Sequence, residues 1–229
     1  MRTSRIVTAL NWRYALGELV LIVLGILIAL AISDWNDLRI QRAQETALLS
    51  EVRTTLENDL SELEGRLAVL RETVPLIEEL SRQLKISVAY EPSMDRLFGA
   101  AYGVHGVNLN TTAYETLKSV GLQSVSNIEL RQGITRIFDH FYEKILIERD
   151  IDIGLTFEVM RPYYLQHFNN LLFLESATPV DYEKVVGDIY FHNIIDYRLA
   201  VLRSNQLQSY PEVMAEINTA LQLLEQELN

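Results

Sequence analysis

Side chains that commonly hold metals or exchange protons are few in this chain and lie far apart. There is no cysteine among the 229 residues, and the four histidines are His105, His140, His167 and His192. None has a glutamate three residues before it, so the Glu-x-x-His pairs of helical di-iron proteins are missing. His140 follows Asp139, but a solvated or hydrogen-bonded helix histidine is the more ordinary interpretation there. We expect no metal and no cofactor.

Catalytic motifs are missing from the sequence as well. It contains no glycine-rich phosphate loop, no G-x-S-x-G elbow and no H-E-x-x-H. A formal net charge of −11 disfavours nucleic acid and anionic lipid surfaces as partners. We therefore expect a protein that is not an enzyme. An enzyme with a site of unfamiliar pattern is kept as an alternative.

Glu18 is the polar residue in the most unusual place. It directly precedes fourteen residues, 19–32, that carry no polar side chain. A carboxylate at membrane depth is costly and usually faces protein, water or a partner charge. We expect either an intramembrane polar contact for Glu18 or plain solvation at the interface, at the level of Trp12 and Tyr14.

The apolar stretch LVLIVLGILIALAI predicts a single membrane-spanning helix over residues 14–35. A helix that is apolar on every face must be buried on every face. Trp12, Tyr14 and Trp35 flank it as interfacial anchors do, so the lipid bilayer is the first expected partner. A secretory signal cleaved after Ala29-Leu30-Ala31 is the alternative. The helical pattern continues past that point without a turn residue, which disfavours cleavage.

Small residues mark one face of this span. Gly25, Ala29 and Ser33 recur every four residues, a spacing that lets another transmembrane helix approach closely. The same face therefore predicts other membrane protein subunits as partners, although small residues are common in spans generally.

Arginine placement predicts the orientation. Residues 1–13 hold three arginines and no acid, whereas only Arg39 and Arg42 follow the span closely. We expect residues 1–13 to be a cytoplasmic tail, the span to lie in a bacterial inner membrane, and residues 36–229 to be periplasmic.

A long helix is predicted over residues 36–85, with a kink or restart near Pro75. Its apolar residues between Leu49 and Leu84 recur in steps of three and four and form one coiled-coil-like seam. The seam can pair with a second copy, giving a homo-oligomer through residues 49–84, or with later helices of the same chain.

Residues 86–229 predict a helical bundle without strands, so the fold class is all-α. Two helix starts are predicted by capping boxes, at Thr112–Glu115 and Ser126–Glu129, and one helix end is predicted by Gly121. The predicted helices are 94–102, 112–120, 127–160 and 188–228. We expect Ile153 and Phe157 to point inward on the third, which Pro162 stops or bends, and Pro211 to kink the last.

Aromatic residues gather in the crossing between the last two long helices, over 163–181. Tyr163, Tyr164, Phe168 and Phe173 predict a partner-binding patch, or else a cap on the bundle core.

The segment GELVLIVLGILIALAISDWND, followed downstream by YETLKSVG, resembles an uncharacterised family of bacterial single-pass membrane proteins. Gly17, Glu18, Gly25 to Leu30, Trp35 and Asn36 match the span motif, and Tyr114, Glu115, Leu117 to Ser119 and Gly121 match the helical-domain motif. Ser33-Asp34 departs from an asparagine pair. The resemblance implies the topology and the helical fold and supplies no activity.

These observations favour an accessory or scaffolding subunit of a larger membrane complex, of the respiratory, photosynthetic or transport kind. An extracytoplasmic ligand sensor that works with a partner protein is the alternative of a different class, and the partner's identity is not encoded in any motif.

Overall fold

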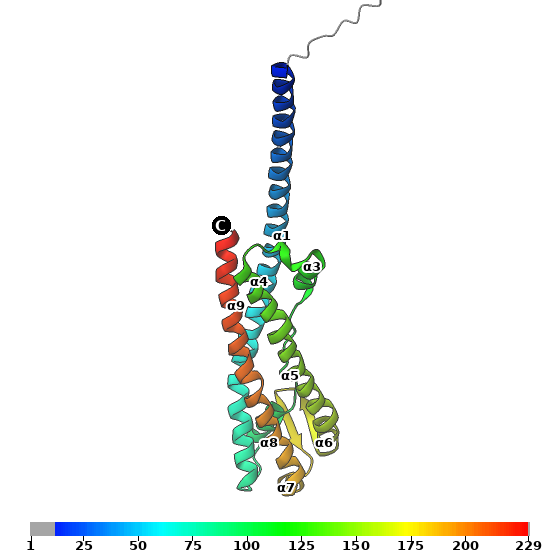
Figure 1. The fold of residues 1–229 in the computed structure, drawn as a ribbon. Coiled ribbons are helices and arrows are strands. Elements are labelled where there is room, and N and C mark those ends of the chain that lie inside the picture. The colour runs from blue at the N-terminus through cyan, green and yellow to red at the C-terminus, as the bar shows by residue number, and fades with distance from the viewer. Residues whose placement is uncertain (1–11, 229) are drawn as a thin grey trace, which may run out of the picture. The chain divides into compact units, whose positions relative to one another are not determined.

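The computed structural model describes residues 12–228, which divide between two compact units, Met1–Ala47 and Leu48–Asn229 (Figure 1). Helix α1 (Trp12–Lys85) contributes to both units. The predicted all-α class is confirmed. Most of the predicted cytoplasmic tail, residues 1–11, and the side chain of the predicted anchor Tyr14 lie outside the described part.

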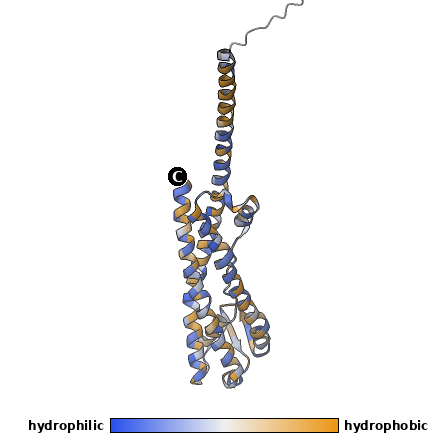
Figure 2. Ribbon diagram, in the orientation of Figure 1, coloured by the Kyte–Doolittle hydropathy of each residue, from blue (hydrophilic) through white to orange (hydrophobic). Residues whose placement is uncertain are grey.

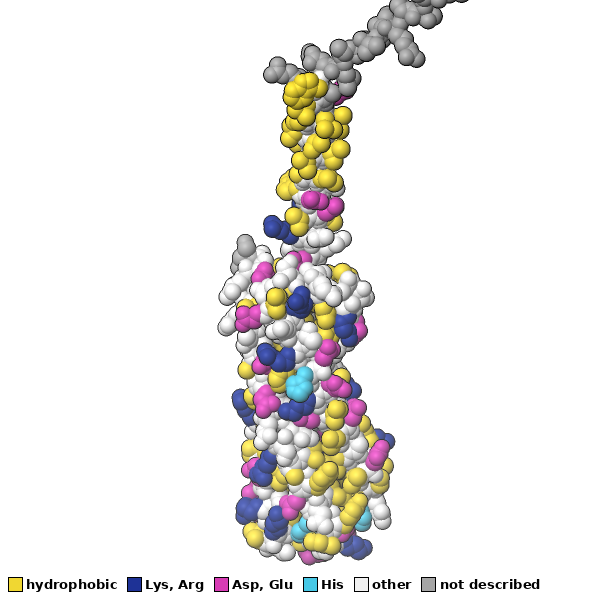
Figure 3. Space-filling model, in the orientation of Figure 1, with side chains coloured by type: hydrophobic (Ala, Val, Ile, Leu, Met, Phe, Trp, Pro, Cys, Tyr) yellow, Lys and Arg dark blue, Asp and Glu magenta, His cyan; other side chains and the backbone are white. Residues whose placement is uncertain are grey.

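The first unit is represented by the N-terminal part of α1. Its large apolar side chains from Leu16 to Ile32 are 47 to 74% exposed. Hydrophobic residues dominate this stretch of α1 and cover most of its visible face (Figures 2 and 3). Among the described residues, α1 is the one helix long and apolar enough to cross a membrane.

Three helical rods build the second unit (Figure 1). The first rod is the part of α1 after Leu48. The second joins α4 (Ile128–Arg136), the π-helical turn η3 (Ile137–Tyr142), α5 (Glu143–Gly154), the π-helical turn η4 (Leu155–Met160) and α6 (Arg161–His167). The third consists of α8 (Ile189–Ser204) and α9 (Gln206–Leu228). Shorter elements are η1 (Pro92–Met94), α2 (Asp95–Ala101), α3 (Thr112–Val120), η2 (Leu122–Ser124), β1 (Phe168–Leu172), β2 (Ser176–Pro179) and α7 (Tyr182–Gly187).

The apolar seam of α1 packs against later helices of its own chain. Leu56, Leu63, Leu70 and Ile77 are completely buried in the single apolar core that the three rods share. Later helices of the same chain therefore cover the seam, as one of the two expectations had it, and a homo-oligomer through residues 49–84 stays a prediction. The helix is continuous through Pro75, so the predicted restart is wrong, while the alternative of a kink there stays a prediction.

The second rod continues through Pro162 to His167, so Pro162 does not stop the helix, and the alternative of a bend there stays a prediction. A proline inside a helix lacks the N–H that bonds the carbonyl four residues earlier. Here the wide turn η4 comes directly before α6, and Pro162 lies in the first turn of α6, where proline is tolerated.

The third rod breaks at Asn205, and the predicted kink at Pro211 stays a prediction. Asn205 has φ −105° and ψ −94° and ends α8, whereas Pro211 lies inside α9. Serine and asparagine compete for backbone hydrogen bonds and favour helix ends, which explains a break at Ser204-Asn205. The predicted helix 188–228 is therefore two helices.

A small antiparallel hairpin contradicts the prediction that the bundle has no strand. Phe168 of β1 lies opposite Pro179 of β2, and Asn169 lies opposite Thr178. The backbone of Ser176 approaches α2 so closely that a Cβ on Gly99 would overlap it. Strands of five and four residues carry too few alternations to be recognised by period alone.

Helix starts were predicted in the right places but with the wrong caps. Thr112 is already helical, and its N–H donates to the side chain of Asn110 at 2.9 Å. Asn127, not Ser126, caps α4 by accepting from Leu130 N–H at 3.1 Å. The predicted stop is confirmed, since Gly121 ends α3 with φ 114°, where glycine is favoured.

Candidate functional site

A buried ion pair joins two rods inside the second unit. The guanidinium of Arg198 on α8 contacts the carboxylate of Asp152 on α5, and both side chains are 0% exposed. Burial lowers the pKa of Arg198, and the neighbouring Asp152 raises it. Burial has the larger effect, so the pKa of Arg198 lies below its usual value.

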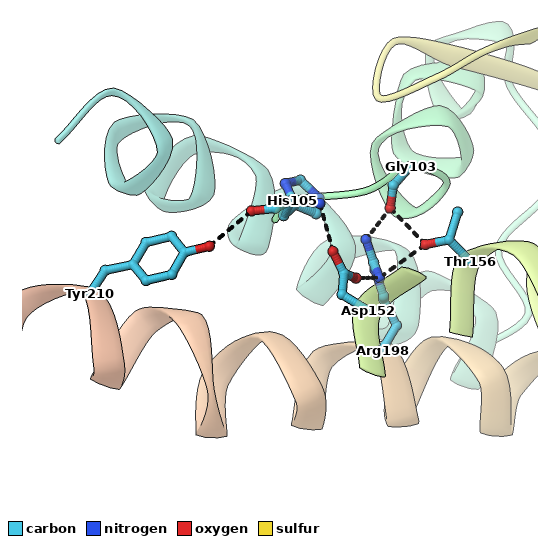
Figure 4. A network of polar contacts seen from close by, with 6 residues as sticks. All are labelled: Gly103, His105, Asp152, Thr156, Arg198 and Tyr210. Atoms are coloured by element: carbon cyan, nitrogen blue, oxygen red, sulfur yellow. Dashed lines mark hydrogen bonds and ion pairs between the residues drawn. The ribbon is translucent and has the colours of Figure 1, made fainter. Parts of the chain in front are cut away.

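Arg198 also holds the loop that follows α2. Its second terminal nitrogen donates to the carbonyl of Gly103, and its first lies 3.4 Å from Thr156 Oγ1 (Figure 4). The Thr156 hydroxyl donates to the same Gly103 carbonyl at 2.9 Å. The arginine thus connects α8, the turn η4 and a loop that lies 95 residues earlier in the chain.

His105 extends the network to α9. Its backbone N–H donates to Asp152 Oδ2 at 2.6 Å, and its carbonyl accepts from the Tyr210 hydroxyl at 3.1 Å (Figure 4). The side chain is 2% exposed. Burial, and then the positive charges of Arg198 and Arg66, lower the pKa of the imidazole to about 3. His105 is therefore neutral near physiological pH.

Glu148 adds a second buried acid, one helical turn before Asp152 on α5. It is 6% exposed and accepts from the Ser209 hydroxyl at 2.6 Å. Burial raises its pKa, with smaller opposing effects from Ser209 and Lys144 and a smaller raising effect from Glu212. The neutral form of this carboxyl is thus favoured more than in water.

A third buried acid joins α1 to the second rod. Asp59 accepts from the Tyr142 hydroxyl at 2.7 Å and from the Asn110 N–H at 3.1 Å. Burial raises the pKa of Asp59 despite these hydrogen bonds. Tyr142 lies in the π turn η3 and Thr156 lies in η4, so each wide turn carries a side chain of a buried polar network. Such turns often occur at functional sites.

None of the residues in this network was predicted from the sequence to form a site. Ile153 and Phe157, predicted to point inward, are only partly buried, while Asp152 and Thr156 are 0% exposed. The available signal was spacing, since Glu148 and Asp152 continue the three- and four-residue steps that begin at Ile145. A scale of hydrophobicity alone discards that signal.

The hydrogen bonds of this network fix segments of the chain against one another. Both carboxylate oxygens of Asp152 and of Asp59 accept hydrogen bonds from the protein itself. Among residues 12–228, no three His, Asp or Glu side chains are grouped so that they could share a metal ion.

The predicted packing face of the span is open in this chain. Gly25 has nothing within 4 Å of where a Cβ would stand, and Ala29 and Ser33 are exposed. Glu18 is exposed on the same helix. The predicted anchors Trp12 and Trp35 are 68% and 66% exposed.

Three of the four residues in the predicted aromatic patch belong to the core. Tyr163, Tyr164 and Phe168 are at most 7% exposed. The ring of Tyr164 stacks on Phe168 at 4.5 Å. Phe173 is 55% exposed and stacks on Tyr102 at 4.8 Å. The partner patch is therefore wrong, because these rings close the bundle core against the hairpin, as the alternative stated.

The described residues form a helical protein in which one helix is suited to crossing a membrane and a second unit has an apolar core with buried polar networks. The model of a family of unknown function, DUF6090, matches residues 18–202, and the chain belongs to this family. The resemblance inferred from the span and from YETLKSVG is thereby confirmed as one to an uncharacterised family. No curated protein and no solved structure matches the chain.

Proposed function

We propose that this protein is a non-enzymatic, single-pass membrane protein that serves as an accessory or scaffolding subunit of a larger membrane complex. The anchor is residues 14–35 of α1, with the N-terminus in the cytoplasm and residues 36–229 on the periplasmic side of a bacterial inner membrane. Twenty residues of helix rise about 30 Å, the thickness of a bilayer core.

One observation carries the proposal: the polar and small residues of the span share a face. At 3.6 residues per turn, Glu18, Gly25, Ala29 and Ser33 lie within about 80° of one another on α1. All four are exposed. A carboxylate at one end of a small-residue face is the arrangement expected where a partner helix packs closely and supplies a donor.

The buried networks of the second unit support a scaffolding role. Arg198, Asp152 and Asp59 are bound by groups of their own chain, so they stiffen the bundle instead of meeting a substrate. A stiff helical unit on a membrane anchor suits a protein that positions neighbours.

The test is gentle extraction of the tagged full-length protein, followed by mass spectrometry of what remains bound at constant stoichiometry. We expect a defined set of membrane proteins, and we expect Ala29→Leu to remove it. Ala31→Leu is the matched control, because it makes the same change on the other side of the helix. Loss of partners in both variants, or in neither, would contradict a specific packing face.

A periplasmic ligand sensor is the second candidate, favoured by an open groove of about 510 Å³ between α1 and α8. Its lining includes Ser81, Lys85, Asp196, Leu199 and Arg203. A chain that purifies without partners and whose unfolding temperature rises with a specific small solute would favour this function over the first.

A further inference from the structure

A row of uncharged side chains lies exposed along α8, away from the core. The row consists of Tyr190, Asn193, Tyr197, Ala200 and Ser204, all of them exposed. They follow one another at steps of three, four, three and four residues, which is the spacing of a coiled-coil seam. We call these five residues the α8 seam.

Helix α8 has two distinct faces: one is buried in the core, and the other is the exposed α8 seam. Phe191, Ile195 and Leu202 are completely buried on the core side of α8. Tyr190 and Tyr197 on the seam are nevertheless 53% and 57% exposed. Tyrosine is enriched at the centre of protein interfaces.

Charges beside the seam are neutralised within the chain. Asp196 accepts from Ser81 at 2.6 Å and pairs with Lys85 at 2.9 Å, and Arg203 pairs with Glu78. The chain as a whole carries −11. Two such acidic chains repel one another except where both present a neutral surface, and the α8 seam is such a surface.

These same ion pairs show the direction of the helices. Arg203 meets Glu78 while Asp196 meets Lys85, so α8 and this part of α1 run antiparallel. If two α8 helices pack in parallel, the Leu48 ends of both second units lie at the same end of the pair. Parallel packing therefore lets both chains continue into one membrane.

We propose that a second copy of this chain packs on the α8 seam, in parallel and in register, about a twofold axis along α8. Tyr190 and Tyr197 would each stack on their counterparts, and Ala200 would let the backbones approach. The Asn193 amides would bond to one another across the axis, as a polar seam residue does when it fixes register.

The strength of this pairing rests on the proposed membrane anchor, whereas its geometry does not. A standard interface buries about 800 Å² per partner, and five seam residues supply only part of that area. Anchoring both chains in one membrane raises their effective concentration without any new contact. We therefore expect dimers in the membrane and weak association after dilution in detergent.

The absence of cysteine from the sequence allows a sharp test. Asn193→Cys and Ala200→Cys are made separately in the full-length chain and oxidised in native membranes. We expect a disulfide-linked dimer on a non-reducing gel for each. Ala215→Cys, an exposed alanine on α9, is the matched control and should remain monomeric.

Three outcomes would overturn the proposal. One is no dimer at either seam position, and another is equal dimer formation by Ala215→Cys. The third is cross-linking only when Tyr190→Cys and Ala200→Cys chains are mixed, which would mean antiparallel packing. Adding Tyr197→Glu to Ala200→Cys should abolish the dimer and leave the helical circular dichroism unchanged. Alkaline carbonate extraction of the same membranes tests the anchor separately.

Discussion

Arg198 and Asp152 are 46 residues apart in the sequence and pair inside the second unit with neither side chain exposed to water. Removing two charges from water costs several kcal/mol for each, and a good pair roughly offsets that cost. The pair therefore contributes more to fixing α5 against α8 than to net stability.

Removing one member of this pair should strongly lower the free energy of unfolding. Asp152→Asn leaves the Arg198 charge buried without a counterion, and we expect a loss of about 3–5 kcal/mol in the free energy of unfolding. Urea denaturation followed by circular dichroism measures it. The double change Asp152→Asn with Arg198→Met should be less damaging than the single one, whereas additive effects would mean that the two residues are not coupled.

A matched control is available on the surface. Arg53 and Glu57 form an ion pair at 2.8 Å with side chains 42% and 49% exposed. Glu57→Gln should leave the unfolding free energy nearly unchanged, because exposed pairs contribute little.

His105 should make stability depend on pH. Its pKa falls to about 3 in the fold, against about 6.5 for a free histidine. Between these values the unfolded chain binds more protons at this position, so the contribution of His105 to stability falls as pH falls, by up to about 1.4 kcal/mol per pH unit.

Comparison of wild type with His105→Asn isolates that contribution. Asp59 and Glu148 have raised pKa values and act in the opposite direction over part of the same range. The measured quantity is therefore the difference in slope of unfolding free energy against pH from 6.5 to 4. Equal slopes in the two proteins would mean that His105 is protonated in the fold.

Glu148→Gln should have opposite consequences at high and low pH. Burial raises the pKa of Glu148, so its contribution to stability is present in acid and is lost as pH rises through the folded pKa. A neutral amide avoids that loss. We expect the variant to unfold at a higher temperature than wild type at pH 8 and not at pH 4; a pH-independent difference would contradict this reasoning.

Two glycines should respond in opposite ways to alanine. A Cβ on Gly99 would overlap the backbone of Ser176, and backbone cannot move aside cheaply. We expect Gly99→Ala to cost about 1–3 kcal/mol. Gly133 in α4 has nothing within 4 Å, so Gly133→Ala should stabilise by about 0.5–1 kcal/mol through helix propensity. The unfolding temperatures of both variants test these two predictions. A Gly99→Ala variant as stable as wild type would show that α2 can move away from β2.

The parts of the fold that were predicted from sequence are those whose signals are local. The span needed only fourteen apolar residues in a row, and the stop at Gly121 needed only one glycine after a helical pattern. The seam from Leu49 to Leu84 was recognised by its period. That period defines a face to be buried, but it does not identify what buries it.

Only the tertiary structure decided the rest. It covered the α1 seam with helices of the same chain and placed Tyr163, Tyr164 and Phe168 in the core. It also brought Gly103, His105, Asp152, Arg198 and Tyr210 together from four segments. A buried charge is stable only where a counterion lies beside it. Here the counterion comes from a distant segment of the chain, and the spacing of residues in the sequence does not predict that contact. Local periodicity therefore determined the helices, and long-range packing determined which of their faces remain free.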